Sequence, residues 1–156
     1  MFVNQADWLT LAWRLGLAML VGGAIGWNRQ KAGKPAGLRT HILVAMGSCV
    51  LVLVPLAGEP ASVEALSRVI QGVIVGIGFL GGGEIRHSGE MTGRNRIKGL
   101  TSAAAIWVSS GLGIAAACGL WRMIILAAVA AILVLAVAKK AEHRLFAPAE
   151  EQEEVP

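Results

Sequence analysis

Tyrosine is absent from the sequence, cysteine occurs only twice, and charged side chains are scarce. Charged residues make up 15% of the 156 positions, whereas soluble domains average about 25%. Hydrophobic residues make up 55%, and this apolar excess indicates that lipid is the solvent. Cys49 and Cys118 both lie in apolar stretches, so the sequence carries neither a zinc nor a redox spacing of cysteines.

The few charges are clustered, which leaves five apolar windows between them. A helix of about 20 residues crosses a hydrocarbon layer of ~30 Å, and the windows approach that length. We therefore predict an all-α membrane protein in which residues 1–146 form a bundle of five transmembrane helices. The predicted spans are residues 8–27, 38–58, 69–85, 100–121 and 123–140.

The two ends of the sequence differ from these windows. The residues before the first window contain no Lys or Arg, whereas a cleavable signal peptide opens with a positive segment, so we expect a retained helix. Residues 147–156 combine two prolines with four acids. That composition predicts a disordered, acidic cytoplasmic tail.

Lysine and arginine concentrate in alternate segments outside the windows, which predicts an orientation. The segments after the second and fourth windows hold one each, Arg68 and Arg122. By the positive-inside rule, the amino terminus is outside and the carboxyl terminus is cytoplasmic. The net charge of +4 then reflects topology and anionic lipid, and nucleic acid is not an expected partner. The basic clusters are Arg29, Lys31, Lys34 and Arg39; Arg86, Arg94, Arg96 and Lys98; and Lys139, Lys140 and Arg144.

Residues 76–81 read GxGxxG, the spacing of a dinucleotide-binding turn. Such a turn needs a strand before it and an amphipathic helix after it. Here a continuous apolar stretch precedes the glycines, and a basic segment beginning at Glu84 follows them. The context therefore argues against a nucleotide site, and no cofactor is expected.

Small residues create flat helix surfaces that let backbones approach closely in lipid. Three GxxxG pairs have this spacing, and the fourth window also has a face of small residues, so the first, third and fourth helices are expected to form the centre and the fifth to face lipid. The same faces favour a homo-oligomer. Alternatively, the run of glycines at 81–83 unwinds the end of the third helix and marks an ion or substrate site. The pairs are Gly22 with Gly26, Gly72 with Gly76, and Gly78 with Gly82.

Arg14 lies about 9 Å into the first predicted helix. Ionisable residues inside spans are often functional, but this side chain leans toward the outer surface and can snorkel. Both an interfacial anchor and a functional cation remain open.

Polar residues also gather at the cytoplasmic edge. The second helix starts at this edge, near Arg29, Arg39, Thr40 and His41, and the fourth starts at Thr101 and Ser102. Hydroxyls and free N–H groups at these two starts either cap the helices or bind an anion or lipid head group.

Glu84, at the end of the third helix, is expected either to pair with the nearby arginines or to relay cations. No pair of buried acids forms a magnesium cage, so no metal site is expected. His41, His87 and His143 fall in separate segments, without an arrangement typical of a catalytic site. We therefore expect a protein that is not an enzyme.

Five short motifs occur in order between residues 10 and 140: RLGLA at 14–18, GWNRQ at 26–30, GLRTH at 37–41, GIGFLGGG at 76–83 and GLTSAA at 99–104, with Trp107. Together they resemble the MgtC/SapB family of bacterial membrane proteins. The resemblance implies a multi-pass domain in the bacterial inner membrane. It further implies links to magnesium homeostasis, stress adaptation and virulence, and control of membrane partners such as the proton-driven ATP synthase.

The sequence departs from this family pattern at several positions. Asn28 stands where the family has an acid, and Ser102 stands where it has a threonine. Longer members carry a soluble cytoplasmic domain, and we expect this chain to be a short form without it. The leading hypothesis is a regulatory adaptor that packs against itself and other membrane proteins; the alternatives are a small ion transporter or channel, and an anion or lipid-headgroup binder.

Overall fold

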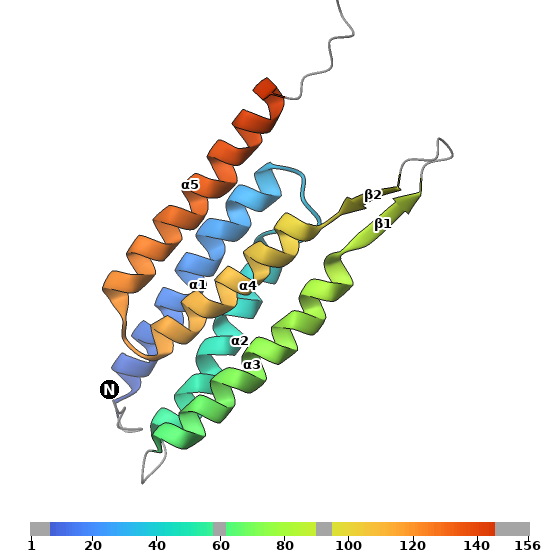
Figure 1. Cartoon of the computed structure of the whole chain (residues 1–156). Coiled ribbons are helices and arrows are strands. Elements are labelled where there is room, and N and C mark those ends of the chain that lie inside the picture. The colour runs from blue at the N-terminus through green and yellow to red at the C-terminus, as the bar shows by residue number, and fades with distance from the viewer. Residues whose placement is uncertain (1–6, 58–61, 90–94, 146–156) are drawn as a thin grey trace, which may run out of the picture.

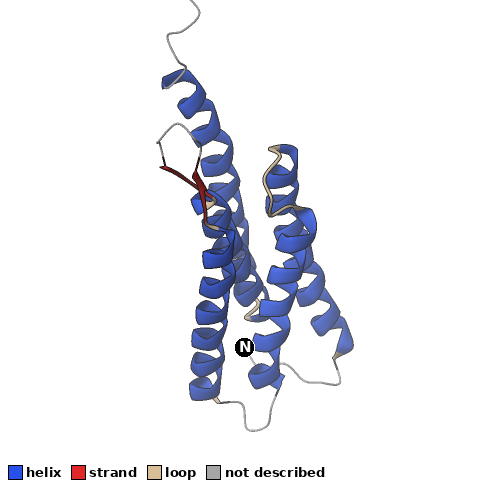
Figure 2. Ribbon diagram, turned by 90° about the vertical axis from the view of Figure 1, so that its right-hand side faces the viewer, coloured by secondary structure: helices blue, strands red, loops and turns tan. Residues whose placement is uncertain are grey.

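The computed structural model describes residues 7–57, 62–89 and 95–145. Over these residues the chain forms five helices and one antiparallel hairpin, in which Arg86 pairs with Lys98. The helices run along a common direction, and the hairpin joins two of them (Figure 1 and Figure 2). The elements are α1 (Trp8–Lys31), α2 (Leu38–Ala57), α3 (Val63–Glu84), β1 (Arg86–Gly89), β2 (Asn95–Lys98), α4 (Leu100–Ala117) and α5 (Trp121–Leu145).

Helices α1 to α4 are long and apolar enough to cross a membrane, judged by length and composition. Helix α5 contains a shorter apolar stretch, Trp121–Val137. The prediction of five helices is confirmed, whereas the crossing of α5 and the orientation of the bundle stay predictions. The predicted tail at 147–156 lies outside the described residues.

Helix α3 begins at Val63, well before the predicted start at residue 69. Ser62 caps it by accepting a hydrogen bond from the Ala65 N–H at 3.2 Å. The added turns carry Glu64 and Arg68, which form an exposed ion pair. Hydropathy alone misses these turns because Glu64, Ser67 and Arg68 lower their mean hydropathy.

The connections around α4 also differ from the prediction. The segment after α3 was expected to be a basic loop, and it contains the hairpin of β1 and β2. Helix α4 ends at Ala117 rather than at residue 121, because Gly119 turns the chain with a φ of +72°. Helix α5 then starts at Trp121.

Helices α1, α2 and α4 form the centre of the bundle, because glycines let their backbones approach closely. A methyl group added at Gly22 would lie 2.6 Å from the carbonyl oxygen of His41. One added at Gly113 would lie 2.1 Å from the carbonyl oxygen of Ala45. Larger residues at either position would therefore separate the helices.

Helix α3 lies at the edge of the bundle, so the expectation that it belongs to the centre was wrong. Of its residues, Val73, Ile77 and Gly81 are buried, and its other glycines do not reach a neighbouring backbone. Helix α5 is also peripheral. It buries Ile124 and Ala128, while most of its large apolar side chains face outward, in agreement with a lipid-facing fifth helix.

Candidate functional site

Four polar side chains from four helices gather inside one end of the bundle, and we call them the polar cluster: Arg29, His41, Glu84 and Ser102. Arg29 is 4% exposed, Ser102 2% and His41 0%, while Glu84 is half-buried. Arg29 Nη2 donates a hydrogen bond to Ser102 Oγ at 2.6 Å. Buried ionisable groups are costly in an apolar bundle, so the cluster is a candidate for function.

Gly26 brings the first two members of the cluster together. A methyl group added there would lie 2.8 Å from Leu38 Cα and 3.0 Å from His41 Cβ. The helices α1 and α2 therefore touch at this level. Arg29 follows Gly26 by three residues and lies on the same face of α1, next to His41.

Gly99 brings the other two members together. It has a φ of +102°, and a methyl group added there would lie 2.2 Å from the backbone oxygen of Glu84. The end of α3 thus packs against the start of α4. Ser102 lies one turn beyond Gly99, and Gly81, one turn before Glu84, faces Ala103, whose Cβ would lie 3.5 Å from an added methyl.

The charges of the cluster interact, but its hydrogen bonds are incomplete. Arg29 and Glu84 attract each other, and both act on His41. His41 Nδ1 and the Gly37 carbonyl oxygen lie 2.9 Å apart, so Nδ1 carries the proton and donates. Arg29 Nε, His41 Nε2 and Glu84 Oε1 are buried without a hydrogen-bond partner among the described residues.

Among the residues that the structure describes, no group of three or more His, Cys, Asp or Glu side chains is placed to hold a metal ion. The polar cluster supplies one carboxylate and one imidazole, with a guanidinium beside them. This arrangement can bind a small polar molecule or exchange a proton.

Arg14 lies at the opposite end of the bundle. Its Nη1 donates a hydrogen bond to the carbonyl oxygen of Ala117, the last residue of α4. The guanidinium packs beside Gly119, where an added methyl group would lie in ordinary contact with Arg14 Nη2, at 3.5 Å. The side chain therefore caps the carboxyl end of α4, where a positive charge is favourable.

The remaining predicted polar residues do not join the cluster. Arg39 and Thr101 are exposed, and Asn28 and Thr40 are half-buried. At the start of α2, Gln30 Oε1 accepts a hydrogen bond from the Leu38 N–H at 3.2 Å. The cap residue of α4 is Gly99, which makes no side-chain capping hydrogen bond. The side chain of Arg86 lies outside the described residues.

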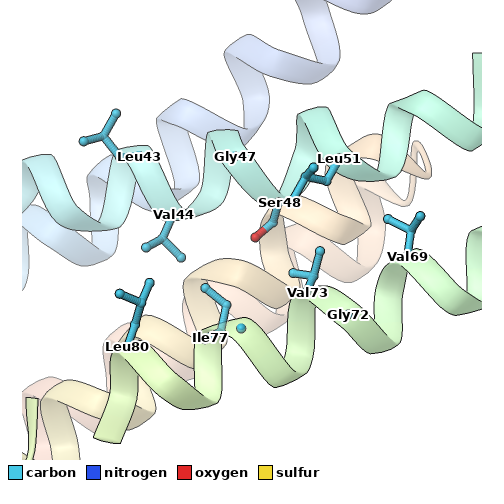
Figure 3. Close-up of a pocket in the computed structure, with 11 residues that line it drawn as sticks. Leu43, Val44, Gly47, Ser48, Leu51, Val69, Gly72, Val73, Ile77 and Leu80 are labelled. Carbon is cyan, nitrogen blue, oxygen red and sulfur yellow. The ribbon is translucent and has the colours of Figure 1, made fainter. Parts of the chain in front are cut away.

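A cavity of about 640 Å³ lies between α2 and α3, and we call it the apolar groove. Side chains of the two helices face each other across it (Figure 3). Its one polar lining residue, Ser48, is hydrogen-bonded to Ser110 at 2.8 Å. The lining residues are Leu43, Val44, Gly47, Ser48 and Leu51 of α2, and Val69, Gly72, Val73, Gly76, Ile77 and Leu80 of α3.

The two GxxxG pairs of α3 lie on opposite sides of that helix, because Gly76 and Gly78 are about 200° apart at 3.6 residues per turn. Gly72 and Gly76 line the apolar groove, whereas Gly78 and Gly82 are exposed outside it. Within residues 7–57, 62–89 and 95–145, nothing lies within 4 Å of a methyl group added at any of the four. These glycines are therefore open surface in the single chain.

Sequence reasoning missed two parts of this arrangement. His41 was expected at the cytoplasmic edge with Arg29 but was not counted among the functional candidates, and the structure buries it fully beside Arg29. The Ser48–Ser110 pair was also missed. The available signal was position: both His41 and Ser48 lie inside a strongly apolar helix, where a polar side chain needs a partner.

The MgtC family model matches residues 15–144 of the chain. Protein SrpB of Synechococcus elongatus is 52% identical over 129 residues, which are 78% of this chain and 71% of SrpB. The "Putative magnesium transporter YhiD" of Escherichia coli K12 is 38% identical over 139 residues, which are 85% of this chain and 62% of YhiD. Protein MgtC of Salmonella typhimurium is 40% identical over 103 residues, 66% of this chain and 40% of MgtC.

These similarities cover most of the chain but only part of the curated relatives, from 40% of MgtC to 71% of SrpB. No solved structure matches the chain.

Proposed function

The chain belongs to the MgtC family, and from this premise we propose that it is a regulatory adaptor of the bacterial inner membrane, without catalytic activity of its own. It acts by packing against membrane partners, including a second copy of itself, during magnesium limitation or related stress. Two relatives carry the names MgtC and magnesium transporter, which supports the link to magnesium. The proposed orientation, with the amino terminus outside, rests on the basic residues between the helices.

The observation that carries the adaptor role is the open glycine surface of α3. Helix association in lipid depends on close backbone contact, and Gly72 and Gly76 offer such a contact beside the apolar groove. The inner glycines Gly22 and Gly113 are already covered by α2. The α3 surface therefore has the character of a helix-binding site that the single chain leaves uncovered.

The replacement Gly76→Leu tests this role because its side chain would occupy the groove, while a Cβ at Gly76 meets nothing within 4 Å among the described residues. We expect loss of partner or self-association, measured by cross-linking in native membranes, together with poorer growth at low magnesium. Gly111→Leu is the matched control, since Gly111 also has nothing within 4 Å but lies on α4. Unchanged association and growth in the Gly76 variant would contradict the proposal.

A second candidate, a small ion transporter, is favoured by the buried charges of the polar cluster. In liposomes, a transporter would carry a magnesium, potassium or proton flux that Glu84→Gln reduces. Glu64→Gln provides the control on the same helix, because Glu64 is an exposed partner of Arg68. No flux under any of the three gradients would leave the adaptor as the function.

A further inference from the structure

Three buried atoms of the polar cluster, each from a different helix, lack a hydrogen-bond partner among the described residues. Arg29 Nε of α1 is a hydrogen-bond donor, whereas Glu84 Oε1 of α3 is an acceptor. In the neutral imidazole His41 Nε2 of α2 is also an acceptor, because Nδ1 of the same ring carries the proton and donates to the Gly37 carbonyl. Among the described residues the cluster therefore has one unpaired donor and two unpaired acceptors.

The backbone contacts keep these atoms in one region. His41 packs on Gly26, three residues before Arg29, and the backbone of Glu84 packs on Gly99, three residues before Ser102. The Arg29–Ser102 hydrogen bond joins the two halves. Glu84 acts electrostatically on both Arg29 and His41, yet no hydrogen bond or ion pair joins it to either within the described part of the chain.

We propose that Arg29, His41 and Glu84 form a site that binds a water molecule within the helix bundle. A water oxygen accepts from Arg29 Nε–H, and its two hydrogens are donated to His41 Nε2 and Glu84 Oε1. This pattern uses three of the four hydrogen bonds that a water molecule can make, which is typical of buried structural water. The water links α1, α2 and the end of α3, which otherwise buries few side chains.

Ions fit the same atoms less well. A metal cation would lie beside the positively charged Arg29 guanidinium, and one of its two ligands would be an imidazole nitrogen, whereas magnesium takes oxygen ligands. An anion would lie beside the Glu84 carboxylate. A neutral molecule with both donor and acceptor capacity suits all three atoms.

Solid-state NMR of the protein in lipid bilayers tests the site, with magnetisation transferred from water to ¹⁵N-labelled histidine. A variant carrying His87→Gln and His143→Gln leaves His41 as the single imidazole signal. We expect water contact at an unprotonated Nε2 of His41. Absence of water contact, or a direct contact between the Arg29 and Glu84 side chains, would overturn the proposal.

Two variants of this reporter protein sharpen the result. Glu84→Leu removes one acceptor and should abolish the water transfer, whereas Glu84→Gln keeps an acceptor oxygen and should preserve it. Glu64→Leu, on an exposed turn of the same helix, should leave the signal unchanged. If the Glu84→Leu protein does not fold, the spectrum of the reporter protein alone still decides the question.

Magnesium titration separates water from a cation. We expect the His41 signal to be insensitive to added magnesium chloride, and a saturable shift would show a cation site instead of the water site. This inference does not depend on the adaptor role, because the spectrum reports the occupant of the cluster whether or not the protein binds a partner.

Discussion

Helices α1 and α3 both carry a GxxxG pair, yet the surroundings of the two pairs differ. Gly22 and Gly26 of α1 lie against the backbone of α2, and an added methyl group at either would meet an atom at 2.6 or 2.8 Å. Gly72 and Gly76 of α3 have open space above them. The same spacing therefore builds the fold in one helix and leaves a free surface in the other.

Alanine substitutions in the two helices test this contrast, and they give the largest effect that we expect. Gly22→Ala should destabilise the bundle by roughly 1–3 kcal/mol through overpacking against α2. Gly72→Ala should instead be neutral or stabilising, by at most about 1 kcal/mol, because alanine favours the helix. Unfolding of both variants in mixed micelles measures the difference. Equal destabilisation would show that the two pairs are equally buried.

Helix α1 also makes a charged contact, in which Arg14 donates a hydrogen bond to the carboxyl end of α4. Arg14→Met should destabilise the protein by about 1–2 kcal/mol, because the Ala117 carbonyl and the helix terminus lose a cationic partner. The same unfolding measurement applies. Arg122→Met serves as the control, since Arg122 lies near that end of the bundle but stacks on the exposed Trp121. Identical stabilities for the two variants would contradict the capping role.

The smallest expected effect concerns the amino-terminal caps of α1 and α3, which are Asp7 and Ser62. The Thr10 hydroxyl and the Thr10 N–H both donate hydrogen bonds to the Asp7 carboxylate. These bonds, the hydroxyl's most of all, lower the pKa of Asp7 below its ordinary value of 3.8. Because the folded pKa is depressed, the stabilisation is complete above the unfolded pKa and is lost as the pH falls through the folded value. The start of α1 should thus fray in acid below about pH 4, whereas the serine cap of α3 should not.

Hydrogen exchange at the first turn of each helix, measured down the pH scale, checks this difference. Asp7→Asn keeps a capping side chain without a titratable group, so it should remove the acid-induced fraying of α1. Fraying that persists in this variant would assign the effect to another group.

The helices could be predicted from the sequence because hydropathy accumulates over some twenty residues in each window. The boundary of α3 could not be, because its first turn is stabilised by the Ser62 cap and an exposed ion pair. The central place of α2 could not be predicted either. It depends on the close contacts that Gly22, Gly26 and Gly113 make with α2. Periodicity reveals that a glycine face exists, but not which helix covers it.

The site was predictable in part. Arg29, Glu84 and Ser102 were proposed as functional candidates, and the structure brings them together with His41. Their meeting depends on the tight backbone contacts at Gly26 and Gly99, which are properties of helix packing and of a left-handed residue rather than of composition. The acid of the cluster comes from α3, whereas the family acid was expected at position 28, where Asn28 stands.

The capping of α4 by Arg14 has a consequence for the order of assembly during synthesis. Every residue of the polar cluster, the apolar groove and the Arg14 contact lies at or before Gly119 and so precedes α5. The four-helix unit is thus fully encoded before α5 leaves the ribosome, and domains generally fold from the amino terminus as they emerge. We expect α5 to pack onto the outside of the bundle after α1 to α4 have already assembled.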